Sequence, residues 1–181
     1  YYYEALANLE RYLKTYPSDK NQAYAHYLIA MCYYETIEDE KRDTAPLIRA
    51  KDKFNFIVEN YPDSDFALDA KFKLGLIEDI LASKEMYLGR HYLKKGKWIA
   101  AINRFKTVIE QYNTTIFVEE ALHRLVEINF KLGLKEESQK YANILGYNYL
   151  SSNWYEKTYK IFNKDYSFQV QKKIKKDKKG V

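Results

Sequence analysis

The chain has 181 residues, of which 46% are hydrophobic and 30% charged, enough to build one compact domain or a short array of repeats with a buried core. Six glycines and three prolines are too few for the many turns of an all-β fold, and a single cysteine, Cys32, excludes an internal disulfide and a cysteine-rich metal site. Residues 164–181 carry the whole net charge of +5, because they hold seven of the 30 basic and two of the 25 acidic residues. The rest of the chain is neutral overall, which argues against nucleic-acid binding.

Long segments rich in Leu, Ala, Lys and Glu, with many of the nineteen tyrosines spaced three or four residues apart, predict an all-α fold. The hydrophilic stretch from Thr36 to Pro46 is expected to be a long loop. Residues 65–95 contain no proline and are expected to form one unusually long helix, with Gly75 and Ser83 as alternative positions for a bend. The eight expected helices cover residues 1–15, 20–36, 46–60, 65–95, 98–112, 116–132, 135–150 and 153–163.

An internal repeat underlies these helices. Three segments end alike, in Tyr16-Pro17-Ser18, Tyr61-Pro62-Asp63 and Tyr112-Asn113-Thr114. The sequence before each ending follows all or part of the tetratricopeptide (TPR) pattern of Leu-Gly, a tyrosine, a small residue and an aromatic residue. Small residues let two antiparallel helices approach each other, and the aromatic rings fill the gap between repeats. The residues assigned to this repeat packing are Ala50, Phe54, Gly89, Tyr92, Ala101 and Phe105.

The expected architecture is a TPR-like right-handed α-solenoid of antiparallel helix pairs, built as a single domain over residues 1–163. The long loop and the long helix account for repeats longer than the standard TPR length. Residues 164–181 are expected to be a disordered basic tail, whose lysines either touch anionic lipid headgroups or only aid solubility. The expected boundaries are a partial repeat at 1–17, repeats at about 18–62, 63–113 and 114–150, and a short terminal helix at 153–163.

The repeats and their insertions resemble the BamD family of outer-membrane assembly lipoproteins. The resemblance is strongest from Asp43 to Leu134 and weaker before residue 20 and after residue 150. The features that carry it are the helix with Ala50 and Phe54 after Arg42-Asp43, the Tyr61-Pro62-Asp63-Ser64 junction followed by Asp69-Ala70, the long helix, the turn from Tyr92 to Trp98, Arg104, and Glu120-Ala121-Leu122.

This resemblance implies a lipid-anchored protein on the periplasmic face of the outer membrane, without enzymatic activity or a cofactor. The partners it implies are the periplasmic domains of the barrel subunit BamA, other lipoproteins of the assembly machine, and unfolded outer-membrane proteins. The chain lacks the lipid-bearing N-terminal cysteine and the first repeat and a half of the family, so it is expected to be a fragment. Cys32 lies within a helical pattern and does not replace that cysteine.

The turn after the long helix is the first candidate partner-binding site. Its basic residues are explained either by the dipole of a solvated helix end or, as the family suggests, by docking to an acidic patch of BamA. Its tryptophan occupies a TPR packing position and is expected to be core. The residues of this candidate docking turn are Arg90, Lys94, Lys95, Lys97 and Trp98.

A second candidate surface consists of Tyr24, Tyr27, Tyr33 and Tyr34 on one predicted helix. Tyrosine is frequent in protein-binding grooves, because its ring packs against a partner while its hydroxyl stays in water. The family suggests that such a surface faces unfolded substrate. At least two of the four are expected to pack between helices instead.

Catalysis has no support in the sequence. His26, His91 and His123 are far apart, and neither a phosphate-binding Gly-rich loop nor a nucleophile elbow is present. Two other functions stay open: a TPR adaptor that captures a peptide tail of a chaperone or signalling partner, and, with less support, an enzyme with an irregular helical fold.

Overall fold

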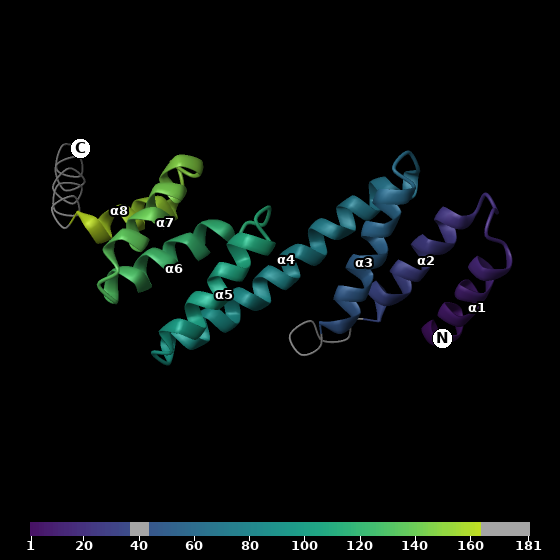
Figure 1. Ribbon diagram of the computed structural model, residues 1–181, viewed down its shortest axis with the longest axis horizontal. Coiled ribbons are helices and arrows are strands. Elements are labelled where there is room, and N and C mark those ends of the chain that lie inside the picture. Colours follow the sequence, from purple (N-terminus) through teal and green to yellow (C-terminus); the bar gives the residue numbers. More distant parts are fainter. Residues whose placement is uncertain (37–43, 164–181) are drawn as a thin grey trace, which may run out of the picture. The chain divides into compact units, whose positions relative to one another are not determined.

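A computed structural model describes residues 1–36 and 44–163 of the chain (Figure 1). The described residues form α-helices and contain no strand, which confirms the predicted all-α class. The predicted loop segment 37–43 and the predicted basic tail 164–181 lie outside the described residues. The helices are α1 (Tyr2–Thr15), α2 (Gln22–Glu35), α3 (Ala45–Asn60), α4 (Asp65–Lys94), α5 (Trp98–Gln111), α6 (Val118–Lys131), α7 (Lys135–Asn148) and α8 (Asn153–Phe162).

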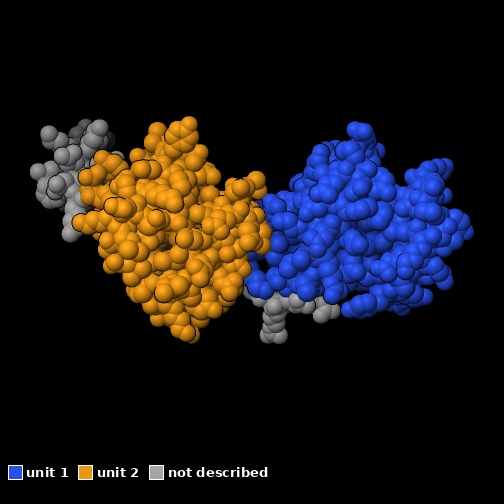
Figure 2. All heavy atoms as spheres, in the orientation of Figure 1, with its two compact units in different colours: residues 1–84 blue, residues 85–181 orange. Residues whose placement is uncertain are grey.

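The chain divides into two compact units, residues 1–84 and residues 85–181 (Figure 2). The long helix is confirmed, because α4 continues through the boundary as one 30-residue helix. It therefore contributes its first part to unit 1 and its last part to unit 2.

In unit 1, α2 and α3 form an antiparallel pair. The ring of His26 lies 4.5 Å from that of Phe56, and the guanidinium of Arg49 lies 5.9 Å from the ring of Tyr33, so the start of α2 is near the end of α3. On α3 the residues Ala50, Phe54 and Ile57, spaced four and three apart, are fully buried. Burying one such phenylalanine side chain stabilises the fold by about 1.5–3 kcal/mol.

The first part of α4 packs along α2 in unit 1. The hydroxyl of Tyr27 donates a 2.6 Å hydrogen bond to Asp69, and the amine of Lys73 lies 5.0 Å from the ring of Tyr34. Both pairs advance in the same direction along the two helices, so α2 and this part of α4 are parallel. This is the arrangement of equivalent helices in successive TPR repeats.

In unit 2, the end of α4 and α5 form the second antiparallel pair. Gly89 on α4 faces the ring of Phe105, and a Cβ atom built on this glycine would lie 2.6 Å from a ring carbon. On α5 the residues Ala101, Phe105 and Val108 are fully buried, with the same spacing as the buried residues of α3. The residues of α3 and α5 that were assigned to repeat packing are therefore buried.

The third pair, α6 and α7, buries polar side chains among its apolar ones, in the part of the chain where the repeat sequence is degenerate. Ser138 replaces the usual small apolar residue, and its hydroxyl donates a 3.0 Å hydrogen bond to the carbonyl of Val126. The buried side chain of Asn129 donates to the carbonyl of Leu125 at 2.7 Å. Both buried polar groups are thus satisfied, and α8 packs on this pair.

Candidate protein-docking site

The candidate docking turn joins α4 to α5 in a compact helix-ending motif. The amide of Lys97 donates to the carbonyl of Tyr92 at 2.9 Å, and the amide of Gly96 donates to that of Leu93 at 3.0 Å. Gly96 has φ of +69°, the left-handed conformation that this motif requires and that glycine adopts without strain. The turn therefore presents its flanking side chains from a defined backbone.

Three lysines of this turn face solvent. Lys94, Lys95 and Lys97 are exposed, and none of them forms an ion pair within the part of the chain that the structure describes. Ile99, in the first turn of α5, is 76% exposed beside them. Ile99 was not predicted from the sequence, although it follows Trp98, a predicted packing residue, and adjacent residues of a helix point to different sides. The turn thus combines unneutralised positive charge with one exposed apolar side chain.

Arg90 does not share the environment of these lysines. Its guanidinium donates two hydrogen bonds to the carboxylate of Glu120 on α6, at 2.9 Å from Nε and 2.6 Å from the second nitrogen. A bidentate pair of this geometry is among the stronger ion pairs in proteins. Arg90, one of the five residues predicted to form the docking turn, is therefore engaged in an intramolecular contact between α4 and α6.

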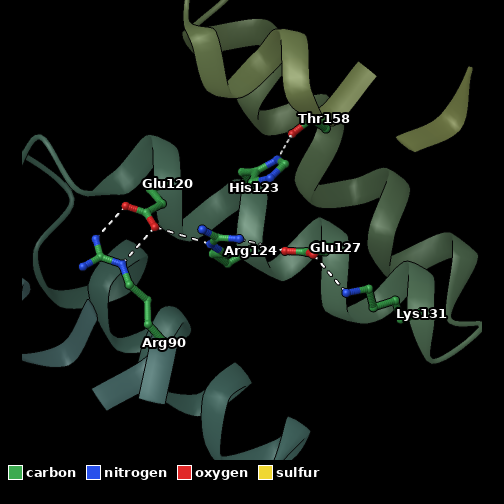
Figure 3. Close-up of polar contacts among 7 residues, drawn as sticks. All are labelled: Arg90, Glu120, His123, Arg124, Glu127, Lys131 and Thr158. Atoms are coloured by element: carbon green, nitrogen blue, oxygen red, sulfur yellow. Dashed lines mark hydrogen bonds and ion pairs between the residues drawn. The ribbon is translucent and has the colours of Figure 1, made fainter. Parts of the chain in front are cut away.

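The pair of Arg90 and Glu120 begins a chain of charges along α6 (Figure 3). Arg124 lies 3.4 Å from Glu120 and 3.0 Å from Glu127, which in turn lies 3.0 Å from Lys131. Partial burial opposes ionisation of Glu120, but the neighbouring guanidiniums outweigh it and hold the pKa of this carboxyl below its ordinary value. Partial burial also opposes ionisation of Glu127, but the bonds to Lys131 and Arg124 outweigh it and lower the pKa of this carboxyl.

His123 lies on the side of α6 that faces α8. Its Nδ1 is 2.8 Å from the hydroxyl of Thr158, and its ring centroid is 5.2 Å from that of Trp154 (Figure 3 shows the first of these contacts). Burial, together with the positive charge of Arg124, lowers the pKa of His123 to about 4. The imidazole is therefore neutral near pH 7, and it holds α8 onto α6.

Trp98 and Tyr92 are half-buried at the base of the turn. Trp98 is the first residue of α5, and the ring of Tyr92 makes an edge contact with that of His91 at 5.9 Å. Neither ring projects fully into solvent, so the lysines and Ile99 form the accessible part of the site.

The four tyrosines proposed to face substrate do not form one surface. Tyr27 and Tyr34 face α4, where Tyr27 bonds to Asp69; burial and this bond raise the pKa of Tyr27 to about 12. Tyr33 lies against Arg49 of α3. Tyr24 is 46% exposed and packs one side of its ring against Phe66, at 5.3 Å. Only Tyr24 therefore presents much of its ring to solvent.

Two further properties of the described ranges bear on the site. They contain no group of three or more His, Cys, Asp or Glu side chains placed to hold a metal ion. None of their helices combines the length and the apolar character needed to cross a membrane.

The paired helices and the packing of small residues against aromatic rings define a TPR-like α-helical repeat protein. Residues 1–145 match the model of the YfiO family, described as outer membrane lipoprotein. The chain is 43% identical over 162 residues to the outer membrane protein assembly factor BamD of Caulobacter vibrioides, covering 90% of this chain and 53% of that protein. It is 43% identical over 160 residues to BamD of Rickettsia prowazekii, covering 88% of this chain and 64% of the relative.

A third relative, BamD of Neisseria gonorrhoeae, is 33% identical over 140 residues, which cover 71% of this chain and 51% of that protein. The chain therefore belongs to the YfiO/BamD family, as the resemblance predicted. It spans between half and two-thirds of the length of these relatives.

Proposed function

We propose that the chain is a non-enzymatic scaffold in the assembly of outer-membrane proteins and that it docks onto the periplasmic domains of BamA. Family membership supports the assembly role, because the relatives bear the name outer membrane protein assembly factor. The observation that carries the docking site is the exposed turn, where Lys94, Lys95 and Lys97 have no ion pair within the described residues. Under this proposal the whole protein is held at the periplasmic face of the outer membrane by a lipid anchor.

The turn suits a folded, acidic partner. Exposed lysines raise the rate of association with a negatively charged surface and set its orientation. The exposed side chain of Ile99 adds an apolar contact that a partner would desolvate. Arg90 has a different role in this proposal, because its bond to Glu120 positions α6 behind the turn. The other partners are further lipoproteins of the same machine and unfolded outer-membrane proteins.

The alternative, a TPR adaptor for a peptide tail of a chaperone or signalling partner, has weaker support. Such adaptors need a peptide-binding surface of exposed side chains. All four candidate tyrosines contact neighbouring helices instead, and only Tyr24 keeps much of its ring exposed. The family of the chain also favours the assembly role.

The docking turn is tested by binding of the 181-residue chain to purified periplasmic domains of BamA from the same organism. Lys95→Glu is expected to weaken binding about 5- to 20-fold, because it replaces an attractive charge by a repulsive one at a surface contact. The control is Lys140→Glu, an identical charge change at an exposed position of α7. Binding is measured by biolayer interferometry at about 50 mM and about 300 mM salt, and the difference between the variants is expected to shrink at the higher salt.

Each outcome is informative. Equal binding of Lys95→Glu and the wild type would keep the assembly role and discard the turn. An equal loss in both variants would point to a general charge effect rather than a docking turn. Failure of the folded wild-type chain to bind would contradict the proposed BamA interaction and favour the adaptor.

A further inference from the structure

The first half of α4 carries an exposed apolar row, Leu68, Phe72 and Leu76, that the docking site described above does not use. Leu68 is 74% exposed, Phe72 is 66% exposed and Leu76 is 36% exposed. Residues four apart on a helix are neighbours on one side of it, so the three side chains lie one above the other. A contiguous row of large exposed apolar side chains, unlike an isolated one, marks an interaction surface.

The contacts of α4 within unit 1 leave this apolar row open. Lys73 lies 5.0 Å from the ring of Tyr34, which places the side of α4 that carries Lys73 against α2. Phe72 points about 100° away from Lys73 around the helix axis, because successive residues of an α-helix differ by that angle. Next to the row, a Cβ atom built on Gly75 would meet nothing within 4 Å. A partner can therefore approach the row without displacing a neighbouring side chain.

An acidic side chain stands at each end of the apolar row. Asp65 and Asp79 lie seven residues before and after Phe72, which is close to two full turns, so both share its side of the helix. Neither forms an ion pair within the described ranges. The dipole of the helix explains an aspartate in the first turn, but it does not explain Asp79 in the middle of a 30-residue helix. The row thus has unneutralised negative charges at both ends, about 21 Å apart along the axis.

The backbone of α4 favours a helical partner over an extended one. An extended segment lying along this helix would find no backbone hydrogen bonds, because those of α4 are closed within the helix. A helix brings its own backbone groups already paired. Side chains spaced four apart also form the ridges that pack into the grooves of a second helix.

The acidic ends argue against a second copy of the chain as that partner. Antiparallel pairing centred on Phe72 would set Asp65 of each copy opposite Asp79 of the other. Parallel pairing in register would set each aspartate opposite its own counterpart. Like charges that face each other across an interface weaken it, so the partner needs positive charges at both ends of its apolar face.

We propose that the first half of α4 docks an amphipathic helix of a partner protein, whose apolar face is flanked at both ends by lysine or arginine. This inference goes beyond the proposed function and does not depend on docking to BamA. The apolar row supplies most of the affinity, because its side chains leave water on binding. The two aspartates set the position of the partner helix along α4.

The probe is a synthetic, fluorescein-labelled helical peptide of about 17 residues with both ends capped, based on alanine and glutamine. It carries three leucines spaced four apart and one lysine three positions beyond each outer leucine, which mirrors the spacing on α4. The comparison peptide has glutamate in place of both lysines. Fluorescence anisotropy measures binding to the 181-residue chain at about 50 mM salt, and we expect the lysine peptide to bind at least about fivefold more tightly.

The apolar row is tested by Phe72→Ala, with Tyr87→Ala as the matched control. Tyr87 is 64% exposed on the same helix, outside the row. Phe72→Ala is expected to lower the affinity for the lysine peptide at least about fivefold, and Tyr87→Ala to leave it unchanged. Circular dichroism checks that both variants fold, which the exposure of the two rings favours.

The acidic ends are tested by Asp79→Lys, with Asp52→Lys at an exposed position of α3 as the control. Asp79→Lys is expected to reduce the preference for the lysine peptide to less than about twofold, because each peptide then meets one attractive and one repulsive end. Asp52→Lys is expected to keep the preference. A purely structural role of Asp79 would weaken the binding of both peptides alike and leave their ratio unchanged.

Several outcomes would overturn the proposal. They include equal affinity of the wild type for the two peptides, unchanged binding in Phe72→Ala, and an unchanged ratio in Asp79→Lys. Equal binding of a lysine peptide in which two alanines are replaced by proline would assign the row to extended segments, since that peptide cannot be helical.

Two other occupants have their own signatures. A concentration-dependent dimer in sedimentation that Phe72→Ala abolishes would assign the row to a second copy. A several-fold rise in peptide affinity in the variant Lys175→Glu, Lys176→Glu would assign it to the chain's own basic residues 164–181. Either result would overturn the proposal.

Discussion

His123 illustrates how a single buried side chain couples two helices to pH. From the sequence, His123 could only be excluded from a paired catalytic or ligand motif, because a lone histidine without paired ligands gives no signal of its environment. Its partner Thr158 lies 35 positions later on α8, and no local spacing predicts that contact. The depressed pKa of about 4 is a consequence of this burial.

The pH dependence of stability follows from that shift. The folded-state pKa of His123 lies below the ordinary value of 6.5, so between these values the unfolded chain binds a proton that the folded chain excludes. The stabilisation is therefore complete above pH 6.5 and is lost as the pH falls towards 4. The free energy of unfolding is expected to drop by about 1–2 kcal/mol between pH 7.5 and pH 5.

Urea denaturation followed by circular dichroism measures this drop. His123→Gln keeps a hydrogen-bonding side chain but cannot titrate, so it is expected to lose about half of the pH dependence or more. Burial also lowers the pKa of His26, which acts in the same direction, and His26→Gln serves as the comparison. A drop in His123→Gln as large as in the wild type would contradict the assignment. The lowered carboxyl pKa values of Glu120 and Glu127 contribute only at lower pH.

At the scale of helices, the repeat pattern indicated which residues pack together. Closeness in sequence did not indicate which charged residues form ion pairs. Gly89 and Phe105 were assigned to packing from their positions in the TPR pattern, and the structure brings them into contact. Arg90 was grouped with the turn lysines because it is close to them in sequence. Its actual partner, Glu120, begins the next helix pair and could only be found from the tertiary structure.

The contact between α4 and α5 gives a test at this scale. Gly89→Ala is expected to destabilise the chain by about 1–3 kcal/mol, because the new methyl group would lie 2.6 Å from the Phe105 ring. Gly75→Ala is the matched control on the same helix, where nothing lies within 4 Å of the added atom. It is expected to stabilise the chain by about 0.5–1 kcal/mol through higher helix propensity. Thermal and urea unfolding measure both, and a shift of the same sign in the two variants would contradict the close contact.

At the scale of the whole molecule, the periodic sequence predicted the antiparallel pairs and the length of α4 within a few residues. It did not predict the division into units at residues 84 and 85, although Ser83 was one of the two alternative positions expected for a bend in the long helix. It also did not predict the exposed apolar row on α4. Such a row depends on which side chains remain uncovered, and that is a property of the tertiary structure.

The two units have separate buried rings, Phe54 in unit 1 and Phe105 in unit 2, and both are fully buried. In repeat proteins each element contacts mainly its neighbours, so a local loss of packing weakens nearby helices most. Phe54→Leu is expected to lower the free energy of unfolding by about 1–2 kcal/mol. The amide hydrogen-exchange rates of α2 and α3 are expected to rise about 5- to 30-fold, and those of α6 and α7 by less than about twofold. Phe105→Leu is expected to produce the reverse distribution. Hydrogen exchange measured by mass spectrometry compares the two variants, and equal rises in both units would show that the chain opens as one cooperative body rather than locally.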